Sequence, residues 1–253
     1  MPHFFVAPEQ ISNDRLSISG EDAHHIARSL RMAAGDSITV SDGVGKEYDC
    51  ILESFEGDAL VTARIVREMP LEGEPPFFLT VFQGLPKGDK LDLIIQKAVE
   101  CGAGRIVPFE STNCTARIKE EAEDRKGVRR SRIAAEAAKQ CGRGRIPAVE
   151  RTVSFADALT KAREAELILF CYEREKETTL RSCLDVWRDQ REQPVAKTPE
   201  IAVFIGSEGG FTPEEAEKAR AGGCCIVSLG NRILRTETVA PFLLGALSYE
   251  FGC

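Results

Sequence analysis

From Phe77 onward, the sequence alternates short continuous apolar runs with segments of helical periodicity, and this alternation constrains the fold more than any other feature. Glu166–Tyr172 and Ile201–Gly206 are runs of the kind found in parallel strands that are covered on both faces. The apolar residues between Leu91 and Val99 recur at the i, i+3, i+4, i+7 and i+8 positions of an amphipathic helix. Alternating strands and helices predict an α/β domain with a mostly parallel sheet.

Other segments of this region carry their own signals. Thr212-Pro-Glu-Glu is a capping box with proline at the first helical position, so a helix is predicted to begin there. The last helix is predicted over about Thr236–Phe251. The remaining predicted elements are strands at Phe77–Phe82, Arg105–Phe109 and Cys225–Leu229 and an alanine-rich helix near Ser131–Cys141.

Residues 1–70 have a different pattern, which is rich in short β runs and turn signals. The predicted strands are Phe4–Val6, Ser37–Ser41, Lys46–Phe55 and Ala59–Val66, interrupted by one helix at Glu21–Met32. A small β-barrel or sandwich fits this pattern. Met69–Pro76 then holds three prolines and a glycine in eight residues, which neither a helix nor a central strand tolerates. We therefore predict a β domain over residues 1–70, a linker over 71–76 and an α/β domain over 77–253.

The compartment is predicted from the cysteines and from the apolar segments. The start, Met-Pro-His-Phe-Phe, does not have the pattern of a secretory signal, and the most apolar late stretch, Val239–Leu247, is too short to span a bilayer. The nine cysteines include no Cys-x-x-Cys pair, and the chain has three histidines. We expect a reduced cytoplasmic protein without disulfides, without a metal site and without a membrane segment.

The charge is unevenly distributed. The net charge is −7, and residues 1–70 carry six basic and twelve acidic side chains. Between Arg125 and Arg145, in contrast, there are eight basic residues and one acidic residue, Glu136. Because phosphates respond to a local basic surface, the acidic total does not exclude a nucleic-acid partner.

Two glycine-containing loops each follow a predicted buried strand and precede a helix. They are Gly206–Phe211 and Leu229–Thr238, and ligands of open α/β sheets bind beyond the carboxyl ends of strands. Glycines at such places let backbone amides approach a ligand closely, although each loop taken alone is also compatible with an ordinary turn. The chain has neither Gly-x-x-x-x-Gly-Lys-Ser/Thr nor Gly-x-Gly-x-x-Gly, so a phosphate cradle is disfavoured. A small cofactor held by loop backbone remains open.

The two loops also carry a family resemblance. Gly-Ser-Glu-Gly-Gly-Phe, followed by Leu-Gly-Asn-Arg-Ile-Leu-Arg-Thr-Glu-Thr, resembles the paired signature of the RsmE family. These are SPOUT-class methyltransferases that act on N3 of a uridine in 16S ribosomal RNA. Further matches are Lys87–Lys90, Gln96–Glu100, Ala134–Arg143 and His24–Arg31, so the resemblance extends over nearly the whole chain.

The resemblance implies a PUA-like β-barrel that binds RNA, joined to an α/β domain whose C-terminal segment forms a trefoil knot. It implies S-adenosylmethionine as the cofactor, a homodimer with the site at the subunit interface, and small-subunit 16S rRNA as the partner. The implied cofactor-binding residues come from three segments: Cys171, Tyr172 and Glu173; Ile205, Gly206, Glu208, Gly209 and Gly210; and Leu229, Gly230, Ile233, Leu234, Arg235 and Thr238.

Methylation of uridine N3 requires alignment of two reactants and removal of a proton. Arg235 is the first candidate, because a guanidinium could stabilise the developing anion of the uridine. An ion pair of Arg235 with Glu208 or Glu237 is the structural alternative. Glu237 is the candidate base, and the alternative is that it complements a helix dipole.

RNA contact is predicted for basic residues on two helices, with solvated helix faces as the alternative. The predicted residues are Arg28, Arg31, Arg129, Arg132 and Arg143. Two other classes of protein stay open at this stage. One is an RNA-binding assembly factor without methyl transfer, which the two intact glycine loops argue against. The other is a small-molecule α/β enzyme with a β-rich appendage, which the basic stretch argues against.

Overall fold

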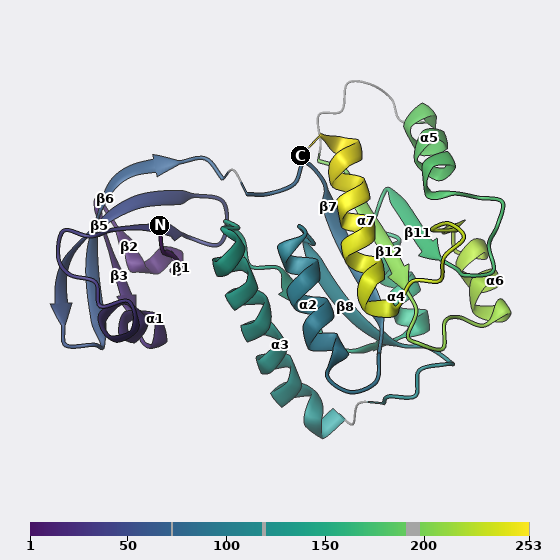
Figure 1. Cartoon of the computed structure of the whole chain (residues 1–253), viewed down its shortest axis with the longest axis horizontal. Helices are drawn as coiled ribbons and strands as arrows, with labels where there is room; N and C mark the ends of the chain where they lie inside the picture. The colour runs from purple at the N-terminus through teal and green to yellow at the C-terminus, as the bar shows by residue number, and fades with distance from the viewer. Residues whose placement is uncertain (72, 118–119, 191–197, 253) are drawn as a thin grey trace. The chain divides into compact units, whose positions relative to one another are not determined.

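The computed structural model describes residues 1–71, 73–117, 120–190 and 198–252 (Figure 1). It contains two compact units, of which the first joins Met1–Glu74 with Ala138–Ile146 and the second joins Pro75–Ala137 with Pro147–Cys253. Our sequence interpretation put 138–146 in the second domain, and the structure differs there. Polar contacts hold 138–146 to the first unit, because Arg143 pairs with Glu74 and Ser41 Oγ donates a hydrogen bond to Gly144 O at 2.5 Å. Position 72 of the predicted linker lies outside the described residues.

The first unit is built on a six-stranded sheet of order β1-β4-β5-β6-β3-β2. β1 runs parallel to β4, and the other neighbouring strands are antiparallel. Alternate residues are buried in the first part of each long strand, namely Tyr48, Cys50 and Leu52 in β5 and Val61 and Ala63 in β6. These side chains form one core with Phe4, Ile38 and Val40. The strands are β1 (His3–Phe5), β2 (Ile11–Ser12), β3 (Arg15–Ser19), β4 (Ser37–Ser41), β5 (Glu47–Glu56) and β6 (Leu60–Met69), with a short turn of helix, η1, at Pro8–Gln10.

The helix predicted at Glu21–Met32 is shorter in the structure. It comprises α1 (Glu21–His24) and a wider helical turn, η2 (His25–Ser29). Arg31 has a φ of 52°, in the left-handed region, and such a residue cannot continue a right-handed helix. The buried side chains of this segment are Ala23 and Ile26, which complete the core of the first unit.

The second unit contains a parallel sheet, as predicted. Its order is β10-β8-β7-β12-β11-β13, with β9 beside β8, and every strand pairing among its described residues is parallel. The strands are β7 (Phe78–Gly84), β8 (Arg105–Glu110), β9 (Ala148–Val149), β10 (Val153–Ser154), β11 (Leu167–Cys171), β12 (Glu200–Ile205) and β13 (Cys225–Val227). The predicted apolar runs are therefore confirmed as strands that are covered on both faces.

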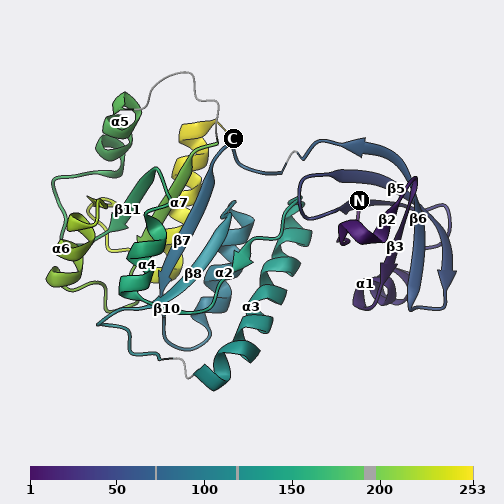
Figure 2. The ribbon, with the colours of Figure 1, turned by 180° about the vertical axis from the view of Figure 1, so that it is seen from behind.

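Helices cover both faces of this sheet (Figures 1 and 2). α2 and α7 pack against each other on one face, and α4 lies on the other. The capping box is confirmed at the start of α6, where Thr212 Oγ1 accepts from Glu215 N at 3.2 Å and Glu215 Oε2 accepts from Thr212 N at 2.9 Å. The helices are α2 (Lys90–Glu100), α3 (Glu120–Cys141), α4 (Phe155–Ala162), α5 (Leu180–Gln190), α6 (Pro213–Ala221) and α7 (Thr236–Phe251).

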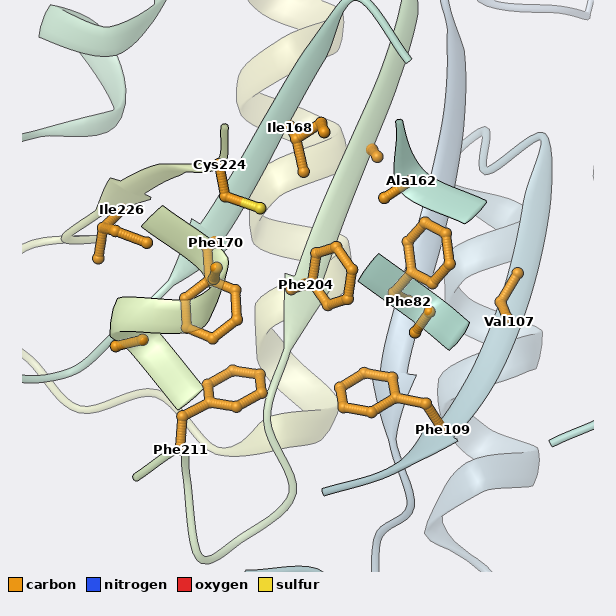
Figure 3. Close-up of a cluster of buried hydrophobic side chains, with 14 residues drawn as sticks. Phe82, Val107, Phe109, Ala162, Ile168, Phe170, Phe204, Phe211, Cys224 and Ile226 are labelled. Carbon is orange, nitrogen blue, oxygen red and sulfur yellow. The ribbon is translucent and has the colours of Figure 1, made fainter. Parts of the chain in front are cut away.

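Phenylalanine rings fill the core beneath α4 and α6 (Figure 3). Phe82 and Phe204 stack from neighbouring strands with ring centroids 4.6 Å apart. Phe211, the last residue of the first glycine loop, lies 4.1 Å from Phe170 between ring centroids and is 2% exposed. Burial of this ring anchors the end of the loop, so the loop's position is set by the core.

The expectation of a chain without disulfides is wrong in this structure. Cys183 of α5 is joined to Cys225 of β13, with 6.7 Å between their Cα atoms. The pairing arises because α5 packs against β13, which the separation of 42 residues along the chain does not reveal. Cys50, Cys114, Cys171 and Cys224 are free thiols.

Candidate active site

A cavity of about 770 Å³ lies at the carboxyl ends of three neighbouring strands of the second unit. Its walls are the segments that follow β11, β12 and β13, so both glycine loops face the same space. This is the edge at which open α/β sheets bind ligands.

The first loop needs glycine because backbone and side chains approach it closely. A Cβ at Gly209 would lie 2.8 Å from Cβ and 2.9 Å from the carbonyl oxygen of Asn113. Gly210 has a φ of 61°, and a Cβ there would lie 2.7 Å from Glu173 Oε1. Gly210 thus favours glycine for its backbone conformation, and a larger residue there would also displace the Glu173 carboxylate.

Hydrogen bonds tie the two loops together. Thr236, which begins α7, is buried and donates its hydroxyl to Gly206 O at 2.7 Å. The same hydroxyl oxygen accepts a hydrogen bond from Gln83 Nε2 at 2.8 Å. Gln83 is fully buried at the end of β7, and a buried amide of this kind holds its partners in one arrangement. Gln83 is not among the site residues predicted from the sequence, although it is a polar residue directly after the apolar run Phe77–Phe82.

Lys90 lines the cavity and contacts two of its carboxylates, and it is not among the site residues predicted from the sequence. Its Nζ lies 2.9 Å from Glu208 Oε1 and 3.7 Å from Glu237 Oε2. Burial raises the pKa of Glu208, but Lys90 and backbone amides outweigh it, so the net pKa is lowered. The pKa of Lys90 is raised, chiefly by its hydrogen bond to Glu208.

Arg235 does not form the ion pair that the sequence analysis left open. Glu208 and Glu237 both pair with Lys90, and within the described ranges no carboxylate pairs with Arg235. The side chain is exposed at the lip of the cavity, and the backbone carbonyl of Arg235 accepts from Thr238 N at 2.8 Å in the first turn of α7. Its guanidinium is therefore available to a ligand.

The structure gathers nearly all the predicted cofactor residues around this cavity. Thr238 is the exception, because it lies exposed on α7 outside the lining. The predicted residues that line the cavity are Cys171, Tyr172, Glu173, Ile205, Gly206, Glu208, Gly209, Gly210, Leu229, Gly230, Ile233, Leu234 and Arg235, and Glu237 joins them.

The predicted RNA-binding residues are placed differently from one another. Arg28 is 67% exposed and pairs with Asp58 at 3.1 Å, and Arg129 is 65% exposed and pairs with Asp92 at 2.5 Å. Arg31 and Arg132 are exposed. Arg143 must be corrected: its side chain is 4% exposed and pairs with Glu74 at 2.6 Å. A buried, paired guanidinium is a structural group and does not present itself to RNA.

The ion pair between Arg143 and Glu74 is expected to stabilise the fold. Replacement Arg143→Met is expected to lower the free energy of unfolding by about 3 kcal/mol, because the partly buried carboxylate of Glu74 loses its cation. Arg145→Met is the matched control, since Arg145 is exposed and its loss should cost less than about 0.5 kcal/mol. Urea denaturation of both variants measures the difference, and equal stabilities would contradict the structural role of Arg143.

Across the described ranges, no three His, Cys, Asp or Glu residues are grouped so that they could hold a metal ion. A search of the same residues found no helix with the length and apolar character needed to cross a membrane.

Comparisons with known proteins agree with this architecture. Residues 73–248 match the family model of an RNA methyltransferase domain, and residues 18–63 match that of an RNA methyltransferase PUA domain. The chain is 32% identical over 234 residues to ribosomal RNA small subunit methyltransferase E of Bacillus subtilis, covering 92% of this chain and 90% of that protein. The protein of the same name from Synechocystis is 32% identical over 96% of this chain and 76% of its own length.

A solved structure extends the comparison to three dimensions. Ribosomal RNA small subunit methyltransferase E from Neisseria gonorrhoeae, bound to S-adenosyl methionine, superposes with a TM-score of 0.84 at 28% identity. The match covers 99% of this chain and 98% of that one. With the sequence matches and the shared domains, this shows that the chain belongs to the family of ribosomal RNA small subunit methyltransferase E.

Proposed function

We propose that this protein transfers a methyl group from S-adenosylmethionine to N3 of one uridine in 16S ribosomal RNA, giving 3-methyluridine. The observation that carries the proposal is the convergence of both glycine loops on one cavity at the carboxyl ends of β11, β12 and β13. The named relatives act on ribosomal RNA of the small subunit, and the Neisseria relative holds S-adenosyl methionine.

The cavity fits this cofactor. Its volume of about 770 Å³ falls within the usual range for small-molecule sites. A Cβ would lie 2.8 Å from Asn113 Cβ at Gly209, 2.7 Å from Glu173 Oε1 at Gly210 and 3.1 Å from Gly210 Cα at Gly206. These three residues therefore present bare backbone at the cavity wall. The residues that would hold the cofactor are those of the predicted set around the cavity, and the cofactor supplies a methyl group activated by a sulfonium.

We also propose that the C-terminal segment forms the trefoil knot implied by the resemblance. Two hydrogen bonds support this, from Gln83 Nε2 to Thr236 Oγ1 and from Thr236 Oγ1 to Gly206 O. They hold the end of β7 against both loops. A glycine is needed at position 84, where a Cβ would lie 2.8 Å from Ser207 N. Such close backbone contact between segments that are distant in sequence, here those of Gly84 and Ser207, is expected where one segment of a knot passes beside another.

Within this site we assign Arg235 and Glu237 to the chemistry. Arg235 would bind the uracil or its phosphate and stabilise negative charge that develops on the base. Glu237 would accept the N3 proton. Arg28, Arg31, Arg129 and Arg132 would contact RNA. Residues 1–70 would form the RNA-binding domain, 71–76 the linker and 77–253 the catalytic domain, except that 138–146 packs with the first unit. The protein would act in the cytoplasm on the assembled subunit.

The exposed face of α7 supports a homodimer. Thr238, Phe242, Gly245 and Tyr249 are exposed at helical spacing, and Phe242 and Tyr249 are 41% and 84% exposed. Leu93 of α2, the helix that packs against α7, is 44% exposed as well. Large apolar side chains that share one exposed face indicate an interaction surface.

The dimer makes a direct prediction. The double variant Phe242→Glu/Tyr249→Glu is expected to run as a monomer, because four buried carboxylates would face one another across a two-fold interface. Val128→Glu is the matched control, since Val128 is 74% exposed on α3 and should leave the dimer intact. Light scattering after size exclusion measures the mass, and a monomeric wild-type protein would contradict the proposal.

The proposed substrate is tested with small subunits and with deproteinised 16S rRNA, both from cells that lack this gene. Label from S-adenosylmethionine is expected to enter the subunits and to enter the free rRNA poorly. Equal labelling of both would contradict the assembled subunit as the substrate. Cofactor binding without transfer to either RNA would favour an RNA-binding factor that lacks the methyl-transfer activity.

A further inference from the structure

Lys90 occupies a position that local helix energetics does not favour. It is the first residue of α2, where the helix dipole presents its positive end and disfavours a cation. The side chain is 38% exposed and lines the cofactor cavity. A lysine at this position therefore needs compensation from outside its own helix.

The compensation comes from two carboxylates on different loops. Glu208 belongs to the first glycine loop and approaches Lys90 Nζ to 2.9 Å, within hydrogen-bonding distance. Glu237 belongs to the first turn of α7 and approaches it to 3.7 Å. Without Lys90, two like charges would face each other at the cavity wall and repel.

The two carboxylates are held in different ways. Glu208 also accepts hydrogen bonds from the backbone amide of Lys87 at 3.2 Å. Glu237 Oε2, in contrast, is enclosed and has no hydrogen-bond partner among the residues that the structure describes, although the side chain as a whole is 18% exposed. Lys90 thus supplies the nearby positive charge that Glu237 needs, while no hydrogen bond occupies the oxygen that faces it.

A cation from the second loop also acts on Lys90. Arg235 opposes the protonation of Lys90, whereas Glu208 and Glu237 favour it. Two carboxylates against one further cation leave the ammonium form of Lys90 stable. Lys90 therefore stays charged over the pH range in which a carboxylate titrates.

We propose that Lys90 is a positioning residue of the methyl-transfer reaction, which holds Glu237 in the orientation that receives the N3 proton of the uridine. This inference rests on the proposed function. In the step that it supports, Glu237 takes the proton from N3. The nitrogen lone pair forms the bond to the methyl carbon while the carbon–sulfur bond breaks, and that electron pair stays on sulfur.

The first test compares Lys90→Met with wild type and with Lys97→Met. Lys97 lies on the same helix and also pairs with a carboxylate, Glu100, at 2.7 Å, but it lies outside the cavity. Lys90→Met is expected to lower kcat about 30-fold, within the usual range for loss of general-base function. Lys97→Met should leave kcat unchanged.

The second test is a double-mutant cycle with Glu237→Gln. If Lys90 acts through Glu237, adding Lys90→Met to Glu237→Gln should lower kcat by less than about twofold further, because coupled residues are not additive. Independent, multiplicative losses would overturn the inference. Thermal unfolding and calorimetric titration with S-adenosylmethionine show whether each variant is folded and binds cofactor.

These outcomes separate the inference from the proposed function. If the wild-type protein binds cofactor but methylates no ribosomal RNA, the proposed function fails. If the wild-type protein is active and Lys90→Met is equally active, only the role of Lys90 fails. Lys90→Arg keeps the charge and should recover most of the kcat, which a role that depends on the lysine amine itself would not allow.

Discussion

Gly209→Val is expected to weaken binding of S-adenosylmethionine at least about 100-fold. The reason is that a displaced loop backbone no longer offers a preformed site, and rearranging it costs binding free energy. The first carbon of any side chain at this position would lie 2.8 Å from Asn113 Cβ and 2.9 Å from its carbonyl oxygen. The loop must move away, and Asn113 Nδ2 would then lose its hydrogen bond to Gly209 O, now 2.9 Å long. Calorimetric titration with the cofactor measures the affinity.

Gly127→Val is the matched control for this substitution. Gly127 lies within α3, and a Cβ there would meet no atom within 4 Å. The same substitution should therefore leave cofactor affinity unchanged. If Gly209→Val remained folded and bound the cofactor as tightly as wild type, the loop would not be the binding site.

Arg235→Ala is expected to lower kcat about 100- to 1,000-fold, the usual loss when a group that stabilises transition-state charge is removed. Affinity for S-adenosylmethionine should change only a few-fold. The reason is that Arg235 is exposed at the lip of the cavity and ties no loop through an ion pair in the described part of the chain. Steady-state kinetics with small subunits, combined with calorimetry, separates the two quantities.

Arg232→Ala controls for loss of positive charge at the same loop, because Arg232 is also exposed and lines the cavity. We expect its effect on kcat to be at least about tenfold smaller, since a charge that does not contact the reacting base contributes less. An Arg235→Ala enzyme with normal kcat would remove Arg235 from the chemistry and leave it as part of the loop surface.

The sequence predicts the elements of the second unit well, because its signals are local. Apolar runs such as Ile201–Gly206 indicate buried strands, and Thr212 with Glu215 marks a helix start that the structure confirms. The order of the strands is not local information. That β7 lies between β8 and β12 depends on long-range packing, which no periodicity reports.

The site residues also fall into those with a local sequence signal and those defined by long-range contacts. Both glycine loops were found from their residues and their place after strands, and the cavity joins them. Lys90 was missed because its partners, Glu208 and Glu237, are distant in sequence and meet it only in the folded chain. Arg143 was misassigned for the same reason, since helical spacing placed it among exposed arginines and gave no sign of Glu74.

The measurement that tests the account most directly is nucleoside mass spectrometry of 16S rRNA. Small subunits from cells that lack this gene are incubated with the purified protein and S-adenosylmethionine, and their rRNA is digested to nucleosides. The account predicts that 3-methyluridine appears, at one site per subunit, and that Arg235→Ala yields almost none. A methyl group on another base, or no new methylated nucleoside with active cofactor binding, would contradict it.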